Sequence, residues 1–115
     1  MIDLLFNKGK TISAFPVKVL YHFTNDSPVP LQAGVTVGSR VFKKAVQRNR
    51  VKRLLREAYR LQKQPLQQAL ILQESQVVLF FIYIGKDLPV YAEVYDKVGI
   101  ILQKVLSQVT NNKAN

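Results

Sequence analysis

The pattern of apolar side chains along the chain predicts β-strands in three places. Residues 15–23 alternate, and residues 32–37 form a second candidate strand ahead of Gly38. Residues 77–84 are a continuous β-branched and aromatic run, which predicts a strand buried on both faces. In the first strand, one face carries Phe15, Val17, Val19, Tyr21 and Phe23, and the other carries Pro16, Lys18, Leu20 and His22.

Three other segments follow the 3.6-residue period of amphipathic helices. A long helix is predicted from Arg48 onward, and Val46 falls outside its apolar stripe of Val51, Leu54, Leu55, Ala58 and Leu61. A short helix is predicted at residues 66–72, after Pro65 interrupts the pattern. The stripe of the last predicted helix is Val94, Val98, Ile101, Leu102, Val105, Leu106 and Val109.

The remaining segments predict turns and ends. Residues 24–30 form a loop, residues 85–89 connect a strand to the last helix, and residues 111–115 form a polar, frayed tail. Residues 2–6 have the spacing of a last helical turn before Gly9, so we expect a helix that a longer chain would complete upstream. This order of elements predicts one α/β domain over residues 1–115, a sheet covered by helices in two layers.

Charge singles out one segment of this domain. Residues 40–63 contain all six arginines and ten of the 17 basic residues, against the single acid Glu57. Arg48, Lys52, Arg56 and Arg60 recur every four residues on the polar side of the long helix, and Asn49 projects between the guanidinium groups. The formal net charge of +10 therefore belongs almost entirely to this segment.

Stacked like charges destabilise a helix by roughly 0.2–0.5 kcal/mol for each pair four residues apart. A fold that keeps them is expected to have a polyanionic partner, and arginine favours phosphate because its planar fork binds two oxygens at once. A solvated helix face, an anionic membrane surface and a groove that binds basic helices remain alternatives. The small Val51 and Ala58 in a stripe without Trp favour packing on a sheet.

Composition limits the chemistry available to the chain itself. There is no Cys, which suits a reducing, cytoplasmic setting, and His22 is the only histidine. The longest apolar run, residues 77–84, is far shorter than the ~20 residues that span a bilayer. The seven acids are scattered, and Glu93 and Asp96 fit the start of a helix. We therefore predict no catalytic residue and no metal site in the protein.

Residues 45–60 resemble the signature of the bacterial ribonuclease P protein component. Its hallmark is Arg-Asn-Arg followed by an aliphatic residue and Lys-Arg, found here as residues 48–53. Phe6 with Gly9, the run Gly34-Val35-Thr36-Val37 and residues 77–81 agree with the family in position. The resemblance implies a mixed sheet, with a left-handed crossover from strand through the Arg-Asn-Arg helix to strand. This is the fold class of a domain in a small-subunit ribosomal protein.

The resemblance also implies function. Proteins of this family are cofactors of a catalytic RNA that removes the 5′ leader of precursor tRNA, and Mg²⁺ is held mainly by the RNA. The chain would act as one protein subunit of a ribonucleoprotein, without a membrane, and would be inactive alone. The residues expected to contact RNA are Arg40, Lys43, Lys44, Arg48, Asn49, Arg50, Lys52, Arg53, Arg56 and Arg60.

The same resemblance assigns Phe6 and Tyr21, with Lys18 nearby, to a cleft that holds the single-stranded leader. By pattern alone Phe6 and Tyr21 would be core residues, and only the resemblance gives them this role. Stacking on such rings would tolerate any base. The alternative function is a ribosomal or RNA-chaperone protein that uses the same basic helix without any role in cleavage.

Overall fold

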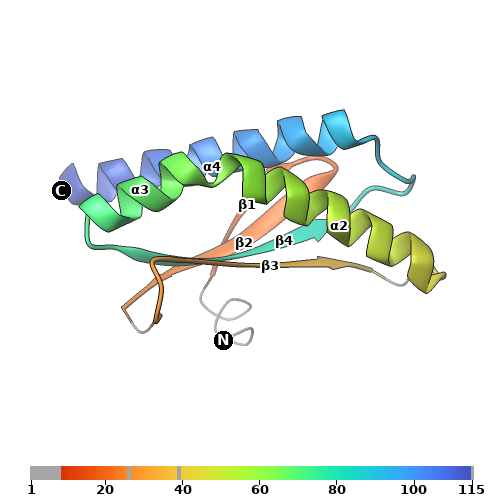
Figure 1. Ribbon diagram of the computed structural model, residues 1–115, viewed down its shortest axis with the longest axis horizontal. Coiled ribbons are helices and arrows are strands. Elements are labelled where there is room, and N and C mark those ends of the chain that lie inside the picture. Colours follow the sequence, from red (N-terminus) through yellow and green to blue (C-terminus); the bar gives the residue numbers. More distant parts are fainter. Residues whose placement is uncertain (1–8, 26, 39, 115) are drawn as a thin grey trace.

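The structure is a computed structural model that describes residues 9–25, 27–38 and 40–114. The described elements are β1 (Lys10–Ala14), β2 (Val17–Thr24), β3 (Leu31–Val37), α2 (Ala45–Gln62), α3 (Gln64–Leu72), β4 (Gln76–Tyr83) and α4 (Tyr91–Ala114) (Figure 1). The strands form one sheet in the order β1-β2-β4-β3. β4 pairs antiparallel with β2 and parallel with β3, so the predicted strand at residues 77–84 is confirmed and lies between two other strands.

The connection between the parallel strands β3 and β4 runs through α2 and α3. In Figure 1 both strands point the same way, β3 lies in front of β4, and α2 lies above them, so the crossover is left-handed. About 98% of such connections between parallel strands are right-handed. The chain therefore has the fold class that its resemblance implied, including the rare hand of its crossover.

All three described helices lie on one side of the sheet, and the core lies between these two layers (Figure 1). α2 contributes Val51, Leu55 and Ala58, each 0% exposed. Burying a side chain the size of Val51 or Leu55 contributes about 1.5–3 kcal/mol to stability. The sheet meets these helices with Val17, Val19 and Tyr21 from β2 and with Val77, Leu79, Phe81 and Tyr83 from β4.

The opposite face of the sheet is formed by the alternate residues of each strand. On β2 these are Lys18, Leu20 and His22, which are partly exposed, and on β4 they include Phe80 and Ile82. None of the described helices lies on this side, which we call the open face of the sheet (Figure 1), although Val78 on this face is only 5% exposed. The prediction that the strand at residues 77–84 is buried on both faces is therefore only partly confirmed.

Several predicted boundaries differ from the structure. β1 was missed because Ile12 and Ala14 are its only two apolar residues on one face, which is too short a pattern to recognise. Phe15 was expected on the first strand, but it is 68% exposed in the turn, and the strand begins after Pro16. The tail predicted to fray continues α4 as far as Ala114.

The predicted helix at residues 2–6 lies outside the residues that the structure describes. Within the described residues, no helix combines the length and the apolar character that crossing a membrane requires.

Leu55 provides a test of how α2 is attached. It is 0% exposed at the centre of the helix, so Leu55→Ala should lower the free energy of unfolding by about 2–5 kcal/mol, as cavity-forming substitutions do. Leu72→Ala is the matched control, because Leu72 ends α3 with 82% of its surface exposed, and it should change stability by less than about 0.5 kcal/mol. Urea unfolding measures both values. Equal losses would contradict the core described above.

Candidate nucleic-acid interface

The packing of α2 decides which of its side chains face solvent. Val51, Leu55 and Ala58 turn toward the sheet and α4, so the helix presents Asn49, Arg50, Arg53, Arg56 and Arg60 outward as exposed residues. Lys52 lies at the flank and is partly buried. Leu61, predicted on the apolar stripe, is 52% exposed, which corrects that prediction: the buried stripe is narrower than the sequence pattern. Val46 is 79% exposed, as expected.

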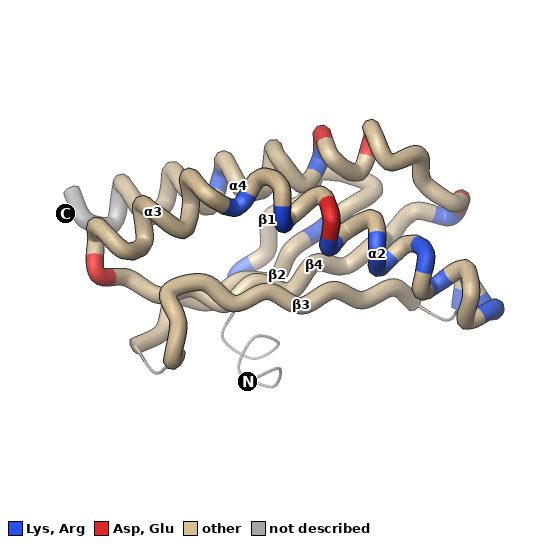
Figure 2. Tube along the Cα trace, viewed as in Figure 1, with Lys and Arg blue, Asp and Glu red and all other residues tan. Residues whose placement is uncertain are grey.

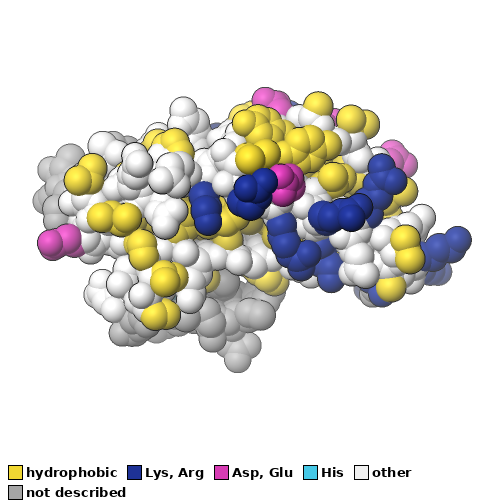
Figure 3. All heavy atoms as spheres, in the orientation of Figure 1, with side chains coloured by type: hydrophobic (Ala, Val, Ile, Leu, Met, Phe, Trp, Pro, Cys, Tyr) yellow, Lys and Arg dark blue, Asp and Glu magenta, His cyan; other side chains and the backbone are white. Residues whose placement is uncertain are grey.

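The basic side chains of α2 and of the residues just before it form one surface, which we call the cationic ridge. It consists of Arg50, Lys52, Arg53, Arg56 and Arg60 of α2 and of Arg40, Lys43 and Lys44, which precede the helix. Figure 2 shows that Lys and Arg positions recur along α2 and just before it, and Figure 3 shows Lys and Arg side chains gathered on that side of the molecule. Arg40, Lys43 and Lys44 are exposed. The structure thus brings these predicted RNA-binding cations onto one side of the molecule.

One ion pair interrupts the ridge. Arg60 donates from Nη2 to Glu57 Oε1 at 2.5 Å and from Nε to Glu57 Oε2 at 3.2 Å. The Arg60 guanidinium lowers the pKa of the Glu57 carboxyl, and Glu57 raises the pKa of Arg60. Among the described residues, the only other ion pair lies outside the ridge, between Lys97 and Asp96 of α4. The ridge upstream of Arg60 is therefore positive and available to an external anion.

Arg48 differs from the other arginines of α2. Its side chain is partly buried, and Nη1 donates to the carbonyl oxygens of Phe42 and Lys43, each at 2.8 Å. Arg48 was predicted as an RNA contact like its neighbours. The structure shows that part of its guanidinium is already engaged by the backbone that leads into α2.

The residues predicted to line a leader-binding cleft are not brought together. Phe6 lies outside the described residues. Tyr21 is 3% exposed beneath α4, where its hydroxyl donates to Gln108 Oε1 at 2.8 Å, whereas Lys18 lies on the open face. Side chains three residues apart on a strand project to opposite faces, so Lys18 and Tyr21 cannot line the same cleft. The structure therefore corrects the assignment of Tyr21, whose ring is part of the core.

The open face carries an aromatic residue that the sequence analysis did not select. Phe80 is partly exposed and lies beside Gly34 of β3, where an added Cβ would come within 2.9 Å of the ring. Gly34 therefore leaves room for the ring over the neighbouring strand. The cross-strand pairing of a glycine with an aromatic residue could have indicated Phe80, but that pairing needs the sheet register, which the sequence alone does not provide.

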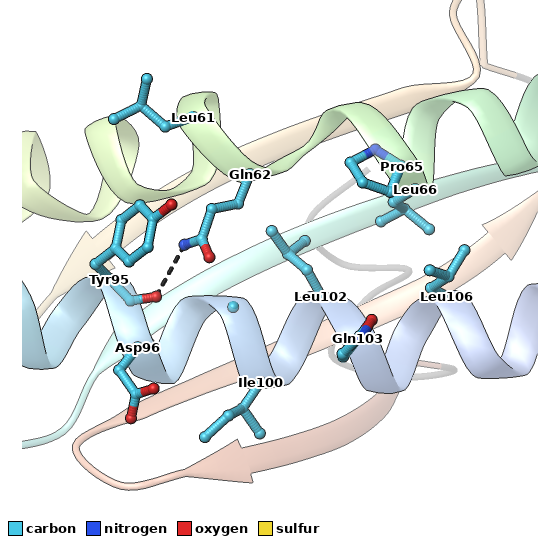
Figure 4. A pocket seen from close by; sticks show the side chains of 11 residues that line it. Leu61, Gln62, Pro65, Leu66, Tyr95, Asp96, Ile100, Leu102, Gln103 and Leu106 are labelled. Atoms are coloured by element: carbon cyan, nitrogen blue, oxygen red, sulfur yellow. Dashed lines mark hydrogen bonds between the residues drawn. The ribbon is translucent and has the colours of Figure 1, made fainter.

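A groove of about 570 Å³ runs between the α2–α3 junction and α4 (Figure 4). Gln62 crosses one end, donating from Nε2 to Tyr95 O at 2.8 Å, and Gly99 leaves room for its amide. The lining is mainly aliphatic, and Asp96 is its only carboxylate. The groove therefore offers no pair of groups for acid–base chemistry.

Elsewhere the described residues contain no cluster of three or more His, Asp or Glu side chains that could hold a metal ion. Burial raises the pKa of Tyr59 to about 12, and the same cause raises the pKa of Tyr83. Both hydroxyls are therefore neutral near pH 7, where Tyr83 donates to Asp87 O at 2.7 Å. Both tyrosines therefore have a packing role. The ring centre of Tyr59 lies 5.8 Å from that of Phe81.

A sheet covered on one side by helices, one of which exposes a nearly continuous cationic surface, is typical of small α/β nucleic-acid-binding proteins. The profile of the family described as Ribonuclease P matches residues 1–105. The ribonuclease P protein component of Porphyromonas gingivalis is 35% identical over 114 residues, covering 96% of this chain and 79% of that protein. The component of Chlorobaculum tepidum is 46% identical over 90 residues, covering 71% and 58%.

Solved structures agree with this match. The ribonuclease P protein of Staphylococcus aureus superposes with a TM-score of 0.72 at 15% identity, covering 90% of this chain and 87% of that one. The protein of Thermotoga maritima gives a TM-score of 0.67 at 20% identity, covering 90% and 92%. The chain belongs to the ribonuclease P protein family. It is the protein component of an endoribonuclease in which RNA performs the catalysis.

The ridge makes a quantitative prediction about salt. If roughly six phosphates are contacted, log affinity for structured RNA should fall against log salt with a slope of roughly −4 to −5, because each contact releases condensed counterions. Arg53→Gln should make that slope shallower by about 0.7–0.9. Lys104→Gln is the control, since Lys104 is exposed on α4, outside the ridge, and should leave the slope unchanged. Filter binding across a salt series measures these slopes, and a wild-type slope near −1 would contradict the ridge.

Proposed function

We propose that the cationic ridge binds the catalytic RNA subunit of ribonuclease P and helps it to hold precursor tRNA while the 5′ leader is removed. The observation that carries this proposal is the set of exposed cations on one side of α2 and its approach, interrupted by a single carboxylate. The family match supports the identity of the RNA partner in general terms. The individual contacts are our inference from geometry and charge.

The physical role of such a ridge is to reduce repulsion between two polyanions. Each arginine or lysine that neutralises a phosphate releases counterions, and arginine can bind two phosphate oxygens in one plane. Magnesium ions perform the same neutralisation in RNA, since they bind phosphate oxygens while keeping several waters. The protein should therefore lower the Mg²⁺ concentration that cleavage requires.

The leader is proposed to pass along the open face of the sheet. Lys18 places a cation there, and Phe80 offers a partly exposed ring, the combination that single-stranded nucleic acid favours. Stacking on a ring does not depend on which base is present, which suits leaders of different sequence. Tyr21 is left out of this surface because α4 covers it.

Bond cleavage itself is assigned to the RNA. We propose that Mg²⁺ is held mainly by RNA groups, because a protein site would need clustered oxygen ligands and the described acids are scattered. The absence of Cys from the sequence supports action in the reducing cytoplasm, where the chain would serve as one protein subunit of a ribonucleoprotein without a membrane.

Cleavage of precursor tRNA at low Mg²⁺ tests this function. A bacterial catalytic RNA should process the precursor several-fold faster with the chain than without it, and the chain alone should process nothing. The double variant Arg53→Gln with Arg56→Gln should lose most of the stimulation, because it removes two exposed ridge cations. Lys97→Gln with Lys104→Gln is the charge-matched control on α4 and should keep it.

Two results would overturn the proposal. No stimulation by a folded protein that still binds RNA would favour a ribosomal or RNA-chaperone role. Cleavage by the chain in the absence of RNA subunit would place catalytic groups in the protein, against the scattered acids of the described residues.

A further inference from the structure

The N-terminus of α2 lacks the features that usually begin a helix. Lys44 occupies the N-cap position without a side-chain hydrogen bond to the helix, and the first turn contains no acidic residue. A Ser, Thr, Asp or Asn cap contributes about 1 kcal/mol, and cations near a helix N-terminus are unfavourable because they meet the positive end of its dipole. Lys43, Lys44 and Arg48 all lie near this end. Something else must hold the approach to α2 in place.

Arg48 provides this connection. One terminal nitrogen of its guanidinium, Nη1, donates to two successive carbonyl oxygens, Phe42 O and Lys43 O, at 2.8 Å each. Hydrogen bonds with a charged donor are roughly twice as strong as neutral ones. The next carbonyl, Lys44 O, accepts from the backbone N–H groups of Gln47 and Arg48 at 3.1 and 3.2 Å, which begins the helix. Arg48 thus ties residues 40–44, which we call the approach segment, to the beginning of α2.

The approach segment is also anchored from the other side. Phe42 is 4% exposed, and its ring centre lies 5.9 Å from that of Tyr83 at the end of β4. Arg40, Lys43 and Lys44 flank this anchor as exposed residues. The backbone of the segment is therefore held between a buried ring and the Arg48 guanidinium, while its three cations face outward.

We propose that Arg48 is a positioning residue: it holds residues 40–44 in register with α2, so that Arg40, Lys43 and Lys44 extend the ridge as one continuous RNA-binding surface. This inference rests on the proposed function for its effect on RNA. Positioning and direct contact differ in what is lost when Arg48 is replaced. If Arg48 only contacted a phosphate, one RNA contact would be lost, whereas loss of positioning would also affect Arg40, Lys43 and Lys44.

The matched pair Arg48→Gln and Arg50→Gln tests the proposal without RNA. Both variants remove one positive charge from the same two turns of α2, but only Arg48 bonds the approach segment. In Arg48→Gln, the backbone amide hydrogens of residues 47 and 48, which donate to Lys44 O, should exchange roughly tenfold faster or more, because the segment opens more often. Arg50→Gln should leave their exchange unchanged. Equal exchange in the two variants would overturn the proposal, whatever the RNA results.

RNA binding supplies the second measurement. Arg50→Gln should make the salt slope shallower by about 0.7–0.9, the value of one contact. Arg48→Gln should make the salt slope shallower by about 2 or more, since Arg40, Lys43 and Lys44 would lose their fixed positions and with them their phosphate contacts. A decrease equal to that of Arg50→Gln would make Arg48 an ordinary phosphate contact.

A double-mutant cycle separates positioning from a general loss of charge. Lys43→Gln with Lys44→Gln should weaken binding strongly in the wild-type background and much less when Arg48→Gln is already present, because positioned residues couple. Strictly additive losses would overturn the proposal. If Arg48→Gln fails to unfold cooperatively, Arg48→Met replaces it: methionine keeps an unbranched side chain but has no donor for the carbonyl oxygens of Phe42 and Lys43. Faster exchange with a shallower slope is then expected, and an unchanged slope and exchange would contradict positioning.

These outcomes are distinct from failure of the proposed function. If the wild-type protein did not stimulate cleavage, the proposed function would be wrong. The difference in amide exchange between Arg48→Gln and Arg50→Gln would still show that Arg48 holds the approach segment. If stimulation held and the two variants behaved alike in exchange, slope and coupling, only the role of Arg48 would fall.

Discussion

The attachment of one face of α2 to the sheet is the constraint on which the rest of the structure depends. Val51, Leu55 and Ala58 are 0% exposed, and Tyr59 packs on Phe81 at the centre of β4. A helix has a fixed angle between successive side chains, so burying one stripe determines where every other residue points. The cations of α2 face outward because the apolar residues between them are held by the core.

This arrangement makes the domain a rigid support for a surface that is unfavourable by itself. Like charges along α2 repel, and its N-terminus has neither a side-chain cap nor an acidic residue in the first turn. Hydrophobic burial offsets these local costs, since a few aliphatic side chains contribute more than the repulsion removes. Repulsion between these cations remains in the free protein and decreases when RNA phosphates bind. The decrease in repulsion contributes to the free energy of RNA binding.

Within this surface, arginines of the same helix have different roles. Arg53 and Arg56 are exposed, whereas Arg60 is held by Glu57, and Arg48 is held by two backbone carbonyl groups. Charge alone does not separate them, because all carry the same guanidinium at neutral pH. Their hydrogen-bond partners distinguish them. These partners depend on the path of the chain before α2 and on the position of Glu57.

The sequence by itself determined the elements with strong periodicity, the cationic helix and the family. The apolar stripe of α2, the interior strand at residues 77–84 and the Arg-Asn-Arg run are local patterns, and local patterns survive without knowledge of the fold. The same alternation favoured Tyr21 as a core residue, which its 3% exposure beneath α4 confirms, so the described residues give its ring no place on an exposed cleft.

Only the tertiary structure decided which face of the sheet the helices cover, which places Tyr21 beneath α4 and leaves Lys18 on the open face. It also decided that Leu61 is exposed, that β1 pairs with β2, and that Arg48 reaches Phe42 and Lys43. All of these have the same physical reason. The period of apolar residues predicts that a strand or helix has two different faces, but which neighbour each face contacts depends on segments far apart in the chain.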